Sequence, residues 1–195
     1  MENKFKNNFI SIYGERVWKD FFNTTRQIPG SDVIKLKFYI EKIDRVSNFY
    51  KIKNKRFTRF VLITLEKYYG NATIDFSEIL KSDSNAYKWE IEHIVSKAKK
   101  KDNRLSNLTI ISRDLNGLEE YKIAEFSKKR ELMKKNKEYY FYLNEIFRNP
   151  SENVDEYFES RGQQLKDDFK KVFCDENYTE YLLKILNISD NDVNR

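Results

Sequence analysis

Apolar residues recur at helical spacing along the first part of the chain. Between residues 5 and 22 they lie three to five positions apart, which places them on one face of a helix. The Ile-Pro-Gly sequence at residues 28–30 ends this pattern. Ser31 or Asp32 can then cap a second helix, whose apolar residues run from Ile34 to Val46.

A third helix is predicted from about Phe57 to Tyr69. Gly70 follows at the position where a glycine commonly ends a helix. The next stretch, Asn71 to Ala86, is polar and predicts a loop with a short helical turn from Phe76 to Leu80.

Two short strands are predicted after this loop. Apolar and charged residues alternate from Trp89 to Ile94, and this alternation is typical of a strand. Lys97 to Arg104 form a basic, polar loop, and Leu108 to Ile111 are apolar and rich in β-branched residues, which favours a buried strand. Two strands joined by one loop predict an antiparallel pair.

Helical spacing returns after the strands and continues almost to the C-terminus. Helices are predicted over residues 115–135, 139–147, 154–173 and 178–188, and the last seven residues form a frayed tail. Asn149 and Pro150 end the second of these helices. The sequence therefore predicts an α+β fold, mostly helical, with a ββα unit between groups of helices.

The composition supports a folded domain with a nucleic-acid or acidic partner. The chain has 195 residues, of which 39% are hydrophobic and 15% aromatic, so a real core is expected. Gly and Pro are scarce, which favours helices over a turn-rich β fold. A net charge of +6 favours nucleic acid or an acidic surface as the partner.

The single cysteine, Cys174, excludes a disulfide within the chain and a cysteine-based zinc site. The N-terminal sequence has no long apolar run, so neither a signal peptide nor a membrane-spanning helix is expected. The cytoplasm is the expected compartment.

The candidate chemistry gathers around His93, the only histidine of the chain. It follows Glu92, and Asn107 and Asn116 stand at the start of the second strand and of the next helix. Carboxylate and amide oxygens suit a Mg²⁺ ion that keeps several waters, and a neutral imidazole can take a proton from water near pH 7. A metal ion and a base together suit phosphodiester hydrolysis.

These residues resemble the pattern of the HNH, or ββα-metal, nucleases, and more narrowly the nuclease half of GmrSD-type modification-dependent restriction systems. The matching segments are Glu92-His93-Ile94, Asn107-Leu108-Thr109, Asn116 and Phe126-Ser127-Lys128-Lys129. The resemblance extends from about Phe57 to Phe173. One departure is Ser96, which stands where the family has a proline.

The resemblance implies a role for each matching residue. His93 is the general base, Asn107 pins the loop and orients the base, Glu92 and Asn116 bind the metal, and Lys129 lies near the phosphate. The implied cofactor is Mg²⁺, with Mn²⁺ as an alternative. The strand geometry raises one difficulty, because Glu92 and His93 point to opposite faces of a regular strand, and Glu90 is then a substitute ligand.

The helical pattern and the extent of the resemblance together predict a domain organisation, and the resemblance implies partners. Residues 1–56 form an N-terminal helical region that could contact a partner, residues 57–175 an HNH nuclease domain with flanking helices, and residues 176–195 a C-terminal helix and tail. DNA is the expected substrate, and no membrane is involved. A subunit carrying the family's separate NTPase (ParB-like) domain is a candidate partner, and a homodimer would supply two sites for double-strand cleavage.

Lysines near the motif are candidates for nucleic-acid binding, although a solvated loop or helix face would have the same composition. They are Lys97, Lys99, Lys100 and Lys101 in the loop and Lys128 and Lys129 on the next helix. The residues leave three alternatives open: a stand-alone homing or toxin-type HNH nuclease, a non-catalytic nucleic-acid-binding subunit that keeps the fold, and RNA as the substrate.

Overall fold

The computed structural model describes residues 55–70, 74–81, 84–96, 102–149 and 154–174, together with the isolated helical positions 7, 10, 11 and 15. Apart from those four positions, the helices predicted over residues 5–22 and 34–46 lie outside the described residues, as does the helix predicted over residues 178–188. The described part is mostly helical and contains one small antiparallel sheet, which confirms the predicted α+β class.

The sheet consists of β1 (Trp89–His93) and β2 (Leu108–Ser112). Trp89 pairs with Ser112 and His93 with Leu108, so the two predicted strands and their antiparallel pairing are confirmed. The first four residues of β2 are buried. The strand therefore lacks the alternation of polar and apolar residues that marks a strand exposed on one face.

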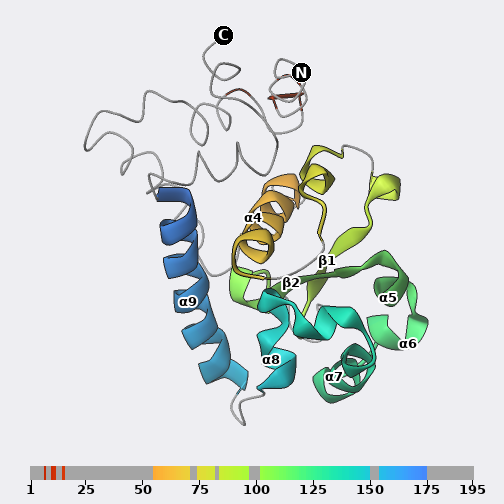
Figure 1. Cartoon of the computed structure of the whole chain (residues 1–195). Helices are drawn as coiled ribbons and strands as arrows, with labels where there is room; N and C mark the ends of the chain where they lie inside the picture. The colour runs from red at the N-terminus through yellow and green to blue at the C-terminus, as the bar shows by residue number, and fades with distance from the viewer. Residues whose placement is uncertain are drawn as a thin grey trace.

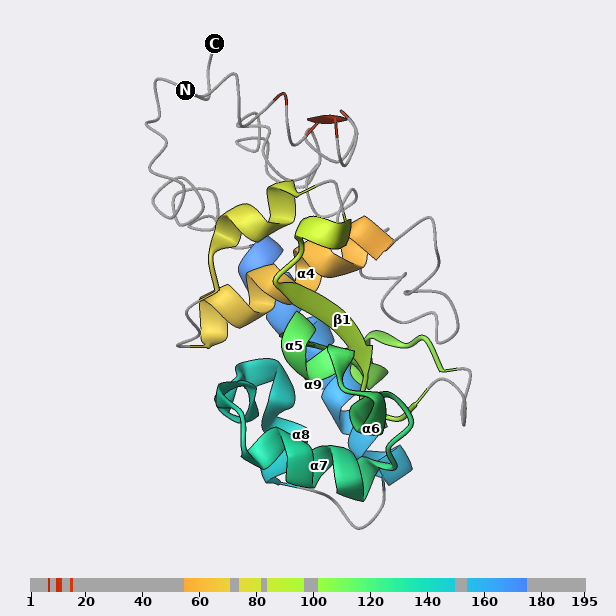
Figure 2. The ribbon, with the colours of Figure 1, turned by 90° about the vertical axis from the view of Figure 1, so that its right-hand side faces the viewer.

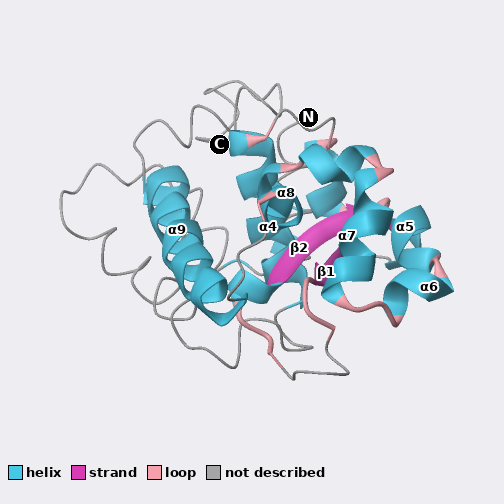
Figure 3. Cartoon of the chain, turned by 90° about the horizontal axis from the view of Figure 1, so that it is seen from below, coloured by secondary structure: helices cyan, strands magenta, loops and turns pink. Residues whose placement is uncertain are grey.

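Helices surround the two strands (Figures 1 and 3). α4 (Lys55–Tyr69) lies on one side of them, and α7 (Phe126–Lys134) and α8 (Glu145–Arg148) lie on the other (Figure 2). α9 (Val154–Cys174) packs against α4 and against the 3₁₀ turn η5 (Leu105–Asn107), which leads into β2. The loop that joins the strands is therefore held from outside by the long helix.

α4 ends as the sequence predicts. Gly70 N donates to the carbonyl oxygen of Glu66 at 2.8 Å, and a Cβ added at Gly70 would lie only 2.6 Å from that oxygen. Glycine fits here because it has no side chain. The predicted helical turn from Phe76 to Leu80 is also present, as the 3₁₀ turn η3 (Phe76–Leu80).

The continuous helix predicted over residues 115–135 is wrong, because the chain turns twice there. It is divided into α5 (Arg113–Gly117), α6 (Glu119–Lys122) and α7. Leu118 is extended, and α6 ends at Lys122. These turns bring Leu115, Tyr121 and Leu132 into one buried cluster, so packing against the core overrides the helical spacing.

The helix predicted over residues 139–147 is also broken into shorter turns. They are η6 (Lys137–Tyr140), η7 (Tyr142–Asn144) and α8. Phe141 is extended between the first two, and the backbone N–H groups of Tyr142 and Leu143 donate to the buried carboxylate of Glu66 at 3.0 and 2.9 Å. The Glu66 side chain of α4 therefore accepts the hydrogen bonds that these two N–H groups would donate within a continuous helix.

Candidate active site

Asn107 ties the two ends of the hairpin loop together. Its Nδ2 donates to the carbonyl oxygens of Val95 and Asp102 at 3.2 and 2.9 Å, and its Oδ1 accepts from the backbone N–H of Val95 at 2.8 Å. The side chain is fully buried, and all three bonds lie within the loop and its strand ends. This geometry fits the loop-pinning role that the family resemblance implies.

Arg161 of α9 holds the same loop from behind, and the sequence analysis gave it no role in the site. Its guanidinium donates to four carbonyl oxygens, those of Leu105, Ser106, Leu108 and Leu143, at 3.3, 2.6, 3.1 and 2.9 Å. Burial lowers the pKa of Arg161 to about 10, so the group remains charged at neutral pH.

The sequence around Arg161 contains a signal of its burial. The residue lies three positions after the buried Phe158 and four before the buried Leu165, on the apolar face of α9. A charged residue on a buried helix face needs partners inside the protein. The carbonyl groups around Asn107 are those partners.

His93 ends β1 and is 8% exposed. Its Nε2 lies 3.1 Å from Oδ1 of Asn103, a residue of the hairpin loop. The neighbouring Asp102 accepts from the backbone N–H of Arg104 at 3.0 Å and forms an ion pair with the Arg104 guanidinium. The ring of the candidate base is thus positioned by a loop that Asp102 and Asn107 both stabilise.

Glu92 points away from this loop and contacts α7. Its carboxylate forms an ion pair with Lys129, whose Nζ also donates to the carbonyl oxygen of His93 at 2.8 Å. Glu92 and His93 therefore contact different segments, as expected for neighbouring residues of a strand. Burial, with the Glu92 charge as a smaller cause, raises the pKa of the nearby Tyr121 phenol.

Lys128 and Lys129 differ in position although both were expected to contact nucleic acid. Lys129 is fully buried, with its Nζ 5.1 Å from the centre of the Tyr121 ring, so its ammonium is directed into the protein and not toward a surface phosphate. Its helix phase explains this burial, because Leu132 and Met133 share its face of α7 and are buried.

Lys128 is exposed, and its Nζ lies 3.8 Å from the carboxylate of Glu120. Lys97, Lys99, Lys100 and Lys101 lie outside the described residues, and their contacts remain a prediction.

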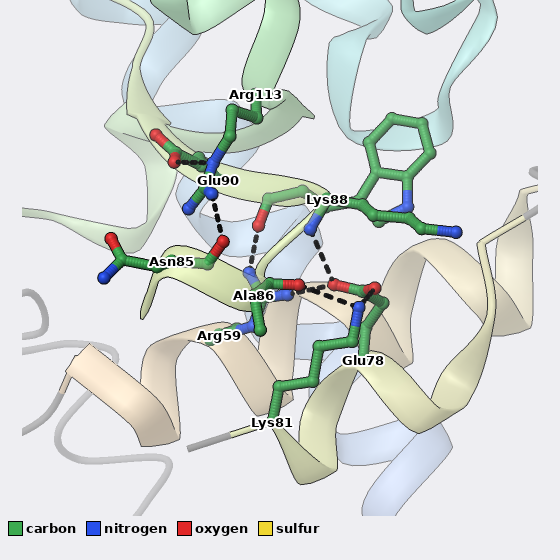
Figure 4. Close-up of polar contacts among 9 residues, drawn as sticks. Arg59, Glu78, Lys81, Asn85, Ala86, Lys88, Glu90 and Arg113 are labelled. Carbon is green, nitrogen blue, oxygen red and sulfur yellow. Dashed lines mark hydrogen bonds and ion pairs between the residues drawn. The ribbon is translucent and has the colours of Figure 1, made fainter. Parts of the chain in front are cut away.

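Asn116 lies on α5 and contacts Glu90 rather than Glu92. Its Nδ2 donates to Oε2 of Glu90, and the Arg113 guanidinium donates to Oε1 of the same carboxylate at 3.0 Å. Figure 4 shows Arg113 between Glu90 and Asn85. The Arg113 guanidinium also donates a hydrogen bond to the backbone carbonyl oxygen of Asn85. If Glu92 and Asn116 bind one metal ion, their side chains are expected to lie together. The side chain that contacts Asn116 is instead that of Glu90.

The side chains on this face of β1 have the chemistry of a hard divalent cation site. Glu90 and Glu92 share the face, and Asn116 joins them from α5. Among the described contacts, none uses Oε2 of Glu92 or Oδ1 of Asn116. The described residues contain no group of three or more His, Cys, Asp or Glu suited to a metal. The oxygen atoms that remain, Oε2 of Glu92 and Oδ1 of Asn116, are of the hard type that suits a Mg²⁺ ion with several waters.

A family model describes the same part of the chain. The model of the GmrSD restriction endonucleases, C-terminal domain, matches residues 37–172. The chain belongs to this family. No significant match was found among curated proteins or among solved structures.

The match to the GmrSD C-terminal domain begins about twenty residues before Phe57, where the sequence resemblance was placed, and ends near the C-terminal end of α9. It covers the hairpin, the loop pinned by Asn107 and the Arg161 anchor. Membership in this family indicates a nuclease of the restriction type. Within the part of the chain that the structure describes, no helix is long and apolar enough to span a membrane.

Proposed function

We propose that the protein is a metal-dependent DNA endonuclease of the HNH class that acts in restriction of foreign DNA. One observation carries the proposal: in a chain of the GmrSD family, the only histidine ends β1 beside a pinned loop, and Glu90 of β1 contacts Asn116 of α5 on the other face of that strand. This order of strand, loop, strand and helix supports the proposal of a ββα-metal site.

His93 acts as the general base in this proposal. The amide oxygen of Asn103 can only accept a hydrogen bond, so Nε2 carries the ring proton and Nδ1 carries the lone pair. Nδ1 takes the proton from the attacking water, and the water oxygen forms the new bond to phosphorus. The bond from phosphorus to the leaving sugar oxygen breaks, and that oxygen takes up a proton from solvent. Asn107 and Arg161 act indirectly by holding the loop that orients the ring.

Glu92 and Asn116 would hold the cation, with Mg²⁺ or Mn²⁺ as the ion. When bound, the ion would supply positive charge against the phosphate and the leaving oxygen. Lys129 of α7 already neutralises Glu92, and it also binds the carbonyl oxygen of His93, so it ties this end of β1 to α7. Because Lys129 donates to Oε1 of Glu92, the proposal assigns Oε2 to the cation.

The first expected outcome concerns the reaction itself. Purified protein is expected to nick supercoiled plasmid DNA with Mg²⁺ or Mn²⁺ and to leave it intact with EDTA, because the phosphate charge needs the cation. Agarose gel separation of supercoiled, nicked and linear forms measures the rate. Equal nicking in EDTA would contradict a metal-dependent mechanism. Single-stranded RNA in a parallel reaction tests the alternative substrate.

Asn116→Ala is expected to raise the Mg²⁺ concentration needed for half-maximal nicking and to lower the maximal rate, because it removes a neutral oxygen ligand. Nicking rates across a Mg²⁺ titration provide the measurement. The matched control is Asn149→Ala, which alters an exposed asparagine near the end of α8. An unchanged Mg²⁺ dependence in Asn116→Ala would remove Asn116 from the metal site.

A non-catalytic nucleic-acid-binding subunit is the second candidate, and the Glu92–Lys129 ion pair favours it, because a buried ammonium already occupies the carboxylate. This candidate predicts salt-sensitive DNA binding and no cleavage with any divalent cation. An NTPase partner subunit or a second copy of the chain could also be required for cleavage. Adding such a subunit to an inactive protein would separate a gated nuclease from a binding module.

A further inference from the structure

Glu90 contacts both residues of the first turn of α5 that face β1. Its Oε1 accepts from the guanidinium of Arg113 at 3.0 Å, and its Oε2 accepts from Nδ2 of Asn116. Arg113 and Asn116 are three positions apart in the helix, so they share one face. A single carboxylate therefore fixes the side chains of that face.

Arg113 is itself anchored, so Glu90 has a fixed counter-ion. The backbone N–H of Arg113 donates to the carbonyl oxygen of Lys88 at 2.9 Å, and its guanidinium donates to the carbonyl oxygen of Asn85. Figure 4 shows that this group connects the start of β1, the turn before it and α5. Glu90 is held in place before any cation binds.

The chemistry of a carboxylate selects one orientation of the Asn116 amide. A carboxylate accepts hydrogen bonds and donates none when ionised, so Glu90 can pair only with Nδ2 of Asn116 and never with Oδ1. The amide oxygen is consequently turned away from Glu90, and no described contact uses it. An unrestrained asparagine would populate both orientations of its amide, and one of them presents the wrong atom to a cation.

We infer that Glu90 is a positioning residue that orients Asn116 Oδ1 toward the cation and thereby sets the affinity of the site for the divalent ion. This inference rests on the proposed function. The family resemblance implies metal binding by Glu92 and Asn116, and strand geometry offered Glu90 only as a substitute ligand.

Glu90→Gln tests the inference, because glutamine has the size of glutamate but does not select one orientation of the Asn116 amide. A glutamine amide can accept from Nδ2 or donate to Oδ1 of Asn116, so both orientations of Asn116 become available. Mn²⁺ affinity, measured by isothermal titration calorimetry without DNA, is expected to weaken by about 10- to 100-fold, the usual effect of losing a residue that orients a metal ligand. Asp114→Asn, which removes an exposed carboxylate from the same helix, is the matched control and should bind Mn²⁺ as the wild type does.

A double-mutant comparison separates positioning from direct ligation. If Glu90 acts through Asn116, Glu90→Gln has no further effect on Mn²⁺ affinity in an Asn116→Ala protein. If Glu90→Gln weakens binding equally in both backgrounds, Glu90 is itself a ligand and the inference is overturned. Wild-type affinity in the Glu90→Gln protein overturns it as well.

The calorimetric result and the nicking result can disagree, and this distinguishes the two proposals. Mn²⁺ binding by the wild type without nicking, also after a partner subunit is added, rejects the nuclease, and the Mn²⁺ titrations alone then decide the role of Glu90. Nicking by the wild type with unchanged Mn²⁺ affinity in Glu90→Gln rejects the role of Glu90 alone. Absence of Mn²⁺ binding by the wild type overturns both the metal site and the inference.

Discussion

His93→Ala is expected to lower the rate of metal-dependent DNA nicking by about 10²- to 10⁴-fold, the usual contribution of a general base. The substitution removes the only imidazole of the chain, and no other histidine can replace it. The fold should survive, because the pinned loop keeps the bonds of Asn107 and Arg161. Plasmid nicking under saturating Mg²⁺ gives the rate.

His93→Gln is a second variant that guards against a structural explanation. The longer glutamine amide can reach the position of Nε2 and donate to Oδ1 of Asn103, so the loop contact is kept while the base is lost. Both variants should unfold near the wild-type temperature and bind DNA normally in EDTA. If both variants nicked DNA at the wild-type rate, His93 would not be the base and the site assignment would be wrong.

The elements fixed by local sequence were predicted well. Gly70 ends α4, the turn from Phe76 to Leu80 is present, and both strands lie within one residue of their predicted ends. The breaks at Leu118 and Phe141 were missed, since each depends on distant partners. The buried cluster containing Tyr121 bends the chain at the first break, and Glu66 of α4 supplies the hydrogen bonds at the second.

The candidate site was predicted as a set of residues but not as a set of contacts. Strand alternation correctly placed Glu90 and Glu92 on one face. It could not say which of them Asn116 would contact, because that depends on where α5 sits after Ser112 caps it. Lys129 was expected near the phosphate because it matches the family lysine, yet the helix phase that it shares with Leu132 and Met133 places it inside the protein.

Arg161→Met is expected to lower the free energy of unfolding by about 3 to 5 kcal/mol, because a buried acceptor left without its donor typically costs about 1 to 3 kcal/mol and several carbonyl oxygens lose theirs. Methionine fills much of the space and needs no charge compensation. It leaves the carbonyl oxygens of Ser106 and Leu108 without the donor they have now, and buried acceptors without partners are costly. Urea denaturation followed by circular dichroism measures the change.

Two further variants separate the effect of losing the Arg161 hydrogen bonds from the effect of any substitution in α9. Glu159→Ala changes an exposed residue of α9 and should alter the free energy of unfolding by no more than about 0.5 kcal/mol. Arg161→Lys should lie between, since one ammonium nitrogen lacks the fork with which the guanidinium reaches both the loop and Leu143. Because these bonds flank Asn107, nicking by any Arg161→Met protein that remains folded should fall as well. Wild-type nicking by that protein would show that the loop keeps its position without the guanidinium, and that Arg161 contributes to stability alone.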